Sequence, residues 1–330
     1  MIDLYNIPND NHNDFRLKKF VEYQHEVPSI HYRFLGQFIK MFNLSKDDVI
    51  WLAWLLSVTY NEITCVFLYS IIKDKMNFDY ENLWKNHKKD LIFGSAKMWN
   101  KRKDLFPSLM DDFNKITNGQ YFTWFNNFIG INAQENYLKI HNSITKIKNS
   151  SRLSADFFLE LIVHLQDYLG INIKCPLILD WKNCANLTSG IYNIFYEDKK
   201  ANDFDKYGKI ENEKFLYQGL LTIQQQIQKT YPQQNSEIPQ FIGKICSFRN
   251  LFKNARYAGF HHDRQLEWIL TYKKQYPQFN NLWNVCFDIR KQIFDKRFLG
   301  ELNGWNGIRK ERKKLWLKYG LTGAEKQCRN

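Results

Sequence analysis

Residues 45–58 have the sequence Ser45-Lys-Asp-Asp-Val-Ile-Trp-Leu-Ala-Trp-Leu-Leu-Ser-Val58. A serine followed three residues later by an acidic residue, here Asp48, is a capping pattern that begins a helix. The apolar side chains that follow recur at the spacing of a helix face and do not alternate as they would in a strand. This stretch therefore predicts a helix with a large apolar face.

The same helical spacing continues along almost the whole chain. Asn61 is placed to cap the next helix, and Gly170 is placed to end a later one. Evidence for strands is thin and limited to residues 171–173 and 176–179. Further helices are expected at about 29–42, 61–72, 79–89, 132–147, 154–169, 212–231, 237–253, 262–275, 280–297 and 305–319. The sequence thus predicts an all-α, multi-helix fold.

Two polar stretches, residues 197–208 and 232–236, interrupt the helical pattern. The first is dense in Asp and Lys, which is typical of an exposed connection. We therefore expect an N-terminal helical lobe of residues 1–196 and a basic C-terminal helical lobe of residues 209–330. With 330 residues the chain is long enough for two separate lobes or for one continuous domain.

The chain is basic and rich in aromatic residues. It has 47 Lys and Arg against 34 Asp and Glu, a net charge of +13, and 16% of its residues are Phe, Trp or Tyr. Such an excess of positive charge favours a polyanionic partner, with nucleic acid first among them, although many basic intracellular proteins bind nothing anionic. The charge gathers in residues 290–330, and a smaller basic cluster spans residues 97–103.

Several classes of protein lack support in the sequence. It has no Gly-Lys-Ser/Thr phosphate loop, no GxGxxG, no HExxH and no GxSxG, which weakens kinase, dehydrogenase, zinc-protease and hydrolase interpretations. Its six cysteines form no CxxC pair, so we expect no metal site and no resident cofactor. The longest apolar stretch, Val49–Leu56, is too short to span a membrane, and no signal peptide is evident, so we expect a cytoplasmic protein without a membrane partner.

Residues 249–267 form the densest polar constellation in the chain. If a helix starts near His262, Asp263 and Glu267 lie four residues apart on one face. Arg256 and Arg264 can then hold an anionic group while a carboxylate accepts a proton. The alternative is an ion-paired helix start after a loop, and the residue types favour neither interpretation.

Two further loops are candidates. Residues 300–309 contain three glycines before a basic helix, and the backbone N–H groups of such a turn can bind an anion. Residues 180–190 form a polar loop before the helical pattern of residues 191–196. In that loop Thr188 or Ser189 can cap the helix, and the sequence does not distinguish between them.

Taken in order, several stretches resemble a phage family, the α-glutamyl/putrescinyl-thymine pyrophosphorylase-like proteins of the second clade, also called amino acid:DNA transferases. The likeness spans most of the chain and is slight between about residues 106 and 150. The matching stretches are residues 32–34, 51–60 with Thr64, 179–198, 248–267, 300–301 and 304–305.

The resemblance implies a fold related to the helical DNA glycosylases and a transferase that acts on modified thymine in double-stranded phage DNA. The base substrate would be 5-hydroxymethyluracil activated as its 5-pyrophosphoryloxymethyl form. An amine, either an amino acid or a polyamine such as putrescine, would displace the pyrophosphate at the exocyclic methylene. No cofactor is required, and Mg²⁺ is conceivable through the pyrophosphate but is not indicated.

This chemistry needs a proton acceptor, cations for the departing pyrophosphate and a pocket for an extruded base. The carboxylates that the resemblance and the polar constellations offer as catalytic groups are Asp263, Glu267 and Glu301. The phosphate or pyrophosphate ligands that we expect are Arg249, Arg256, Arg264, Arg309 and Lys310. The stacking or pocket residues that we expect are Tyr60, Tyr257, Trp305, Thr188 and Ser189.

Two other classes of function stay open. One is a glycosylase-like enzyme that excises a base, in which Asp263 would stabilise the sugar cation. The other is a non-catalytic helical DNA-binding protein whose positive charge neutralises phosphates without regard to the base. The products formed on modified DNA distinguish these classes from a transferase.

Overall fold

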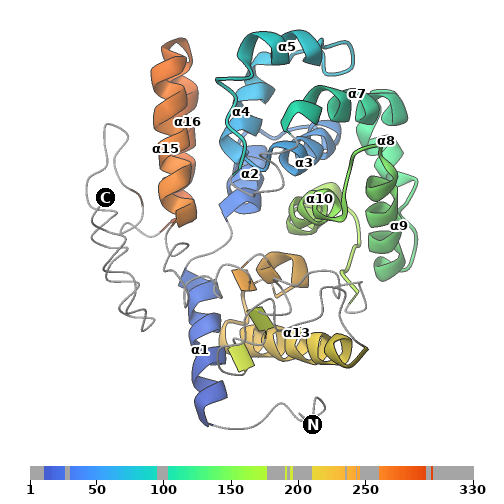
Figure 1. The fold of residues 1–330 in the computed structure, drawn as a ribbon, viewed down its shortest axis with the longest axis vertical. Helices are drawn as coiled ribbons and strands as arrows, with labels where there is room; N and C mark the ends of the chain where they lie inside the picture. Colours follow the sequence, from blue (N-terminus) through green and yellow to red (C-terminus); the bar gives the residue numbers. More distant parts are fainter. Residues whose placement is uncertain are drawn as a thin grey trace. The chain divides into compact units, whose positions relative to one another are not determined.

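The structure is a computed structural model that describes residues 11–26, 30–94, 103–176, 190–191, 194–195, 210–234, 236–242, 244–245, 260–294 and 299. Every regular element in these residues is helical (Figure 1), which confirms the predicted all-α fold. Within the same residues, no helix combines the length and apolar character needed to cross a membrane. The elements are α1 (Asn11–Glu26), α2 (Ile30–Met41), α3 (Lys46–Thr59), α4 (Glu62–Ile71), α5 (Tyr80–His87), η1 (Lys103–Leu105), α7 (Phe106–Thr117), α8 (Tyr121–Asn126), α9 (Ala133–Lys146), α10 (Arg152–His164), α11 (Gln166–Leu169), α13 (Ile210–Thr230), α15 (Phe260–Gln275), η4 (Pro277–Phe279) and α16 (Asn280–Ile293).

The helix ends confirm the local capping signals in the sequence. The Oγ of Ser45 accepts a hydrogen bond from the backbone N–H of Asp48 at 3.1 Å, at the start of α3. Asn61 caps α4, and Gly170 ends α11 in the left-handed conformation with φ 68°. The sequence predictions did not include α1, α7 and α8. No side chain caps α7 or α8, so these helices lack the local start signal that marks α3 and α4.

The chain divides into two compact units, each assembled from separate segments. Unit 1 comprises residues 1–29, 176–263 and 306–330, and unit 2 comprises residues 30–175 and 264–305. This division differs from the sequential lobes expected from the sequence. The predicted connection at residues 197–208 and the predicted helix at 305–319 both lie outside the described residues, so the sequential arrangement stays a prediction.

In unit 1, α1 packs against α13. One face of α13 buries side chains at helical spacing. Gln24 of α1 uses its Nε2 to donate to the carbonyl of Gln240 at 3.1 Å, which ties α1 to the segment after α13. The buried side chains of α13 include Leu216, Leu220, Ile223 and Ile227.

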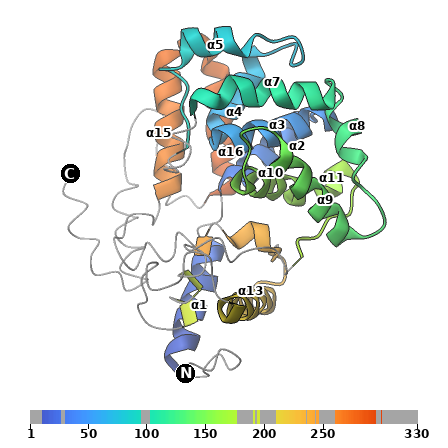
Figure 2. The same ribbon diagram turned by 45° about the vertical axis from the view of Figure 1, so that its right-hand side comes forward.

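Unit 2 is organised around α3. Every residue of this helix from Val49 to Thr59 is buried, so the helix is surrounded by protein on all sides. The helices α4, α7, α8 and α10 all contact it, and Figure 2 shows them around it. The indole Nε1 of Trp54 donates to the carbonyl of Leu109 at 3.2 Å and joins α3 to α7. The C-terminal end of α3, where Tyr60 follows, is therefore fixed in the core of unit 2.

The contact between α2 and α10 in unit 2 depends on a glycine. A Cβ added at Gly36 would lie 2.6 Å from Cδ2 of His164, so a larger residue there would force the imidazole to move. The imidazole of His164 also packs on the ring of Tyr32, with centroids 4.9 Å apart. Burial, together with the charges of Lys40 and Arg33, lowers the pKa of His164 to about 4. The imidazole is therefore neutral at pH 7.

This depressed pKa makes stability depend on pH. Below its ordinary pKa of 6.5, His164 takes up a proton in the unfolded chain but stays neutral in the folded one. The contribution of His164 to the free energy of unfolding is complete above about pH 6.5 and is lost as the pH falls towards 4. In urea titrations at pH 7 and pH 4.5, we expect wild type to lose more unfolding free energy than His164→Gln, by on the order of 2 kcal/mol. Equal losses in the two proteins would contradict this assignment.

Candidate functional site

The structure describes the side chains of two of the site residues predicted from the sequence, Tyr60 and Glu267. Asp263 and Arg264 have described backbones within α15, but their side chains lie outside the description. The other predicted site residues all lie outside the described residues. They are Thr188, Ser189, Arg249, Arg256, Tyr257, Glu301, Trp305, Arg309 and Lys310.

Glu267 lies on the exposed side of α15. Two residues earlier on the same helix, Gln265 is fully buried. Residues two apart on a helix point in nearly opposite directions, so α15 turns Gln265 inward and Glu267 outward. Asp263 precedes Glu267 by four residues in the same helix, and the two positions share one face, as the sequence predicts.

Tyr60 has an unusual backbone. It follows α3 in the left-handed conformation, with φ 50° and ψ 35°, and its N–H donates to the carbonyl of Leu56 at 2.7 Å. A residue with a Cβ pays about 1–2 kcal/mol for this conformation, so the surroundings must hold it in place. Gly94 contributes to this, because its N–H donates to the carbonyl of Thr59 at 2.9 Å. A Cβ at Gly94 would lie 2.1 Å from the carbonyl oxygen of Tyr60, so this contact requires glycine.

The ring of Tyr60 is half-buried. It packs on the ring of Phe157, with centroids 3.8 Å apart, and against the imidazole of His31 at 4.6 Å. The ring is thus held by aromatic neighbours, while the residue as a whole stays partly exposed. A fixed, partly exposed aromatic ring is the kind of surface on which a nucleobase stacks.

Glu62 lies two residues after Tyr60, in the first turn of α4, and is fully buried. His31 of α2 donates from Nδ1 to its Oε2 at 2.5 Å, and Gln265 of α15 donates from Nε2 to its Oε1. Burial alone would raise the pKa of Glu62. The charge and hydrogen bond of His31, with the hydrogen bonds from the helix backbone and Gln265, overcome that effect and lower it. The carboxyl is therefore ionised at neutral pH.

Arg290 is a second buried charged residue, and Gln265 links it to Glu62. The Nη1 of Arg290, on α16, donates to Oε1 of Gln265 at 2.7 Å, and its Nη2 donates to the carbonyl of Leu299 at 2.9 Å. Burial lowers the pKa of Arg290 to about 9, against the opposing effect of Glu62, so the guanidinium stays charged at pH 7. The side chain is fully buried. Arg290 thus belongs to the core of unit 2, although by sequence it opens the basic C-terminal region.

Hydrogen bonds also join the start of α4, directly after Tyr60, to the segment around Ile92 and to α15. Asn61 caps Thr64 through Oδ1 at 2.9 Å, and within the described part of the chain its buried Nδ2 has no hydrogen-bond partner. The hydroxyl of Thr64 donates to the carbonyl of Ile92 at 2.5 Å and contacts the hydroxyl of Tyr272 at 2.8 Å. The backbone around Tyr60 is therefore anchored to α15 as well as to α3.

We name the group formed by Tyr60, His31, Glu62, Gln265 and Arg290 the Glu62 network. It joins α2, α4, α15 and α16, which lie together in unit 2 (Figure 2). Sequence analysis predicted only Tyr60 among its members. One local signal was available for Glu62, because it is the only charged residue in the apolar segment of α4.

The network has the parts of an acid–base site. An ionised carboxylate that accepts from Nδ1 of His31 fixes the ring's tautomer and stabilises the imidazolium that forms when Nε2 takes up a proton. His31 also lies against Tyr60, which connects the buried carboxylate to the partly exposed ring. Among the described residues, no group of three or more His, Cys, Asp or Glu side chains is placed to hold a metal ion.

No protein-family model, curated protein or solved structure matches this chain.

A double-mutant cycle tests the buried pair. Removing one partner leaves the other charge buried without its counterion, so Glu62→Gln and His31→Asn should each cost about 3 kcal/mol of unfolding free energy at pH 7. The double variant should cost little more than either single variant, which gives a coupling of about 2 kcal/mol. Urea titration of the four proteins measures it.

The exposed pair Glu135 and Lys139 on α9, at 3.5 Å, serves as the control. Its coupling should stay below about 0.5 kcal/mol, because solvent screens it. A coupling between Glu62 and His31 as small as the control's would show that the buried pair does not form.

Proposed function

We propose that the chain is a DNA base-modifying transferase that replaces the pyrophosphate of 5-pyrophosphoryloxymethyluracil in double-stranded DNA with an amine, either an amino acid or a polyamine. The resemblance to the amino acid:DNA transferases supports the reaction, and the net charge of +13 supports a nucleic-acid partner. The observation that carries the proposal is Tyr60, a partly exposed ring in a constrained backbone, in contact with the buried His31–Glu62 pair.

In this proposal an extruded pyrimidine stacks on Tyr60. Extrusion is required because the exocyclic methylene of a stacked base is not accessible from all sides, and base-modifying enzymes take the target base out of the duplex. The ring of Tyr60 is presented at a fixed angle by the left-handed backbone and by Phe157.

The bond changes in the reaction balance without a cofactor. The amine nitrogen forms a bond to the methylene carbon as the carbon–oxygen bond breaks, and pyrophosphate leaves with the electron pair of that bond. The nitrogen then gives up a proton. In its neutral form, His31, backed by the carboxylate of Glu62, is our first candidate for the acceptor. Asp263, Glu267 and Glu301 remain candidates from the sequence, with Glu267 on the outward face of α15.

The cations that the departing pyrophosphate needs are assigned from the sequence and the resemblance alone. A group with two to three negative charges leaves more readily when guanidinium groups hold its oxygens. The remaining pocket residues are likewise assigned from the sequence and the resemblance alone. They are Tyr257, Trp305, Thr188 and Ser189. The cation candidates are Arg249, Arg256, Arg264, Arg309 and Lys310.

One assay tests the reaction. The protein is incubated with duplex DNA that carries 5-pyrophosphoryloxymethyluracil and with a mixture of amines, and the digested nucleosides are weighed by mass spectrometry. We expect a heavier nucleoside whose added mass identifies the amine. Abasic sites revealed by alkali would instead assign a glycosylase-like activity, and binding without any product would assign a non-catalytic DNA-binding protein.

Tyr60 variants locate the activity. Base–aromatic stacking contributes about 1–3 kcal/mol, so Tyr60→Ala should lower kcat/KM by roughly 5- to 150-fold, and Tyr60→Phe should retain most of it. Phe128, which is also half-buried in unit 2, provides the matched control. We expect Phe128→Ala to leave kcat/KM within about twofold. Equal losses in Tyr60→Ala and Phe128→Ala would place the base elsewhere.

A further inference from the structure

Two helices of unit 2 end side by side. Tyr276, directly after α15, places its hydroxyl 3.3 Å from Nδ1 of His87 and 3.3 Å from Oδ2 of Asp90, at the end of α5. The ring of Tyr276 also packs on Phe67, with centroids 4.5 Å apart, which anchors this junction to the core. Figure 2 shows α5 next to one end of α15. The C-terminal ends of α5 and α15 therefore form one continuous surface.

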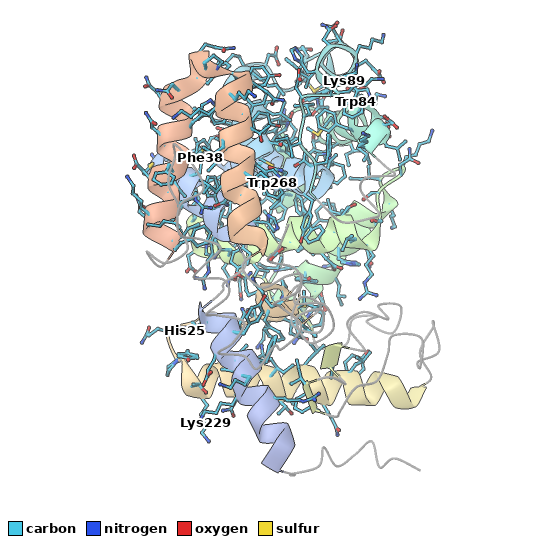
Figure 3. The ribbon with its side chains drawn as sticks, turned by 60° about the vertical axis from the view of Figure 1, so that its left-hand side comes forward. His25, Phe38, Trp84, Lys89, Lys229 and Trp268 are labelled. Atoms are coloured by element: carbon cyan, nitrogen blue, oxygen red, sulfur yellow. The ribbon has the colours of Figure 1, made fainter. Side chains whose placement is uncertain are left out.

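Five lysines lie at these two helix ends. Figure 3 shows Lys89 at the outer end of unit 2, beyond the buried Trp84. None of the ion pairs in the described part of the chain includes Lys85, Lys88, Lys89 or Lys274. We call the group the lysine surface; its members are Lys85, Lys88, Lys89 and Lys274, all exposed, and the half-buried Lys273.

Helix stability explains only part of this arrangement. A cation in the last turn of a helix interacts favourably with the helix dipole, which accounts for one lysine at each end. Further lysines on the adjoining ends repel one another, and Asp90 is the one carboxylate among the residues that join the two ends. Such a gathering of like charge is stabilised by a polyanion that contacts several of the lysines at once.

The lysine surface and the Glu62 network are joined by the same helix, α15. Lys273 follows Gln265 by eight residues of α15, a distance of about 12 Å along the helix axis. Between them, Tyr272 bonds to Thr64 and to the N–H of Ile92, so the same helix carries both sites rigidly. At about 3.4 Å per base pair, the separation corresponds to roughly four base pairs of duplex DNA.

We infer that the lysine surface binds the phosphate backbone of duplex DNA, a few base pairs from the base that reaches Tyr60. The inference rests on the proposed function for the identity of the polyanion. It is tested by binding alone, so its failure and the failure of the proposed function are distinguishable.

The test neutralises the exposed lysines and measures the salt dependence of binding. Each phosphate contact contributes about 0.9 to the magnitude of the slope of log K against log salt concentration, so the loss of four lysines should lower that magnitude by about 3.6. We expect affinity for a 20-base-pair duplex, measured by fluorescence anisotropy, to fall at least tenfold at 100 mM salt. The variant carries Lys85→Gln, Lys88→Gln, Lys89→Gln and Lys274→Gln.

The matched control removes the same charge from four exposed lysines elsewhere in unit 2. It carries Lys115→Gln, Lys139→Gln, Lys146→Gln and Lys148→Gln. We expect its slope to change by less than 1 and its affinity by less than threefold. Equal losses in the two variants would overturn the inference, because they would reflect net charge alone. Retained DNA binding with lost binding to phosphatidylserine vesicles would overturn it too, since the surface would then fit a membrane.

The transferase assay separates the two proposals. The lysine variant should raise KM for modified DNA and leave kcat at saturating DNA within about twofold, because its substitutions lie outside the Glu62 network. If wild type yields no modified nucleoside but the binding difference holds, only the proposed function fails. If product forms and the two variants bind DNA alike, only the lysine surface fails.

Discussion

The carboxylate of Glu62 is the group on which unit 2 depends. A buried, ionised carboxylate is costly unless charge and hydrogen bonds compensate it. His31 and Gln265 supply them from α2 and α15, and Arg290 adds its charge through the amide of Gln265 from α16. These helices are far apart in the sequence, so the carboxylate is satisfied only when all of them are in place. The network thus favours one arrangement of α2, α4, α15 and α16.

The same constraint fixes the candidate site. Tyr60 precedes Glu62 by two residues, and its left-handed backbone persists because α3 holds it from one side and the network and Gly94 hold it from the other. The aromatic ring, the imidazole and the carboxylate are therefore positioned by one set of contacts. The lysine surface depends on the same contacts, because α15 carries Gln265 in its N-terminal half and Lys273 and Lys274 in its last turn.

Local signals made much of the fold predictable. Ser45, Asn61 and Gly170 each act within a few residues of themselves, and a sequence pattern records such contacts directly. The Glu62 network could not be found in this way. Its hydrogen bonds join residues 31, 203 and 25 positions apart, and only the folded chain brings them together. Basic residues look alike in sequence whether they face solvent or the core, as the buried Arg290 shows. Tyr60 was predicted because of its place in the motif, but its backbone conformation was not.

Photo-crosslinking tests the central claim, that a pyrimidine stacks on Tyr60 beside the buried pair. A duplex with 5-iodouracil at the target position is irradiated in complex with the protein, and the crosslinked peptide is identified by mass spectrometry. The predicted result is a crosslink at Tyr60 that disappears in Tyr60→Ala and persists in Phe128→Ala. Crosslinks that map only to other aromatic residues, and that are unchanged in Tyr60→Ala, would contradict the account.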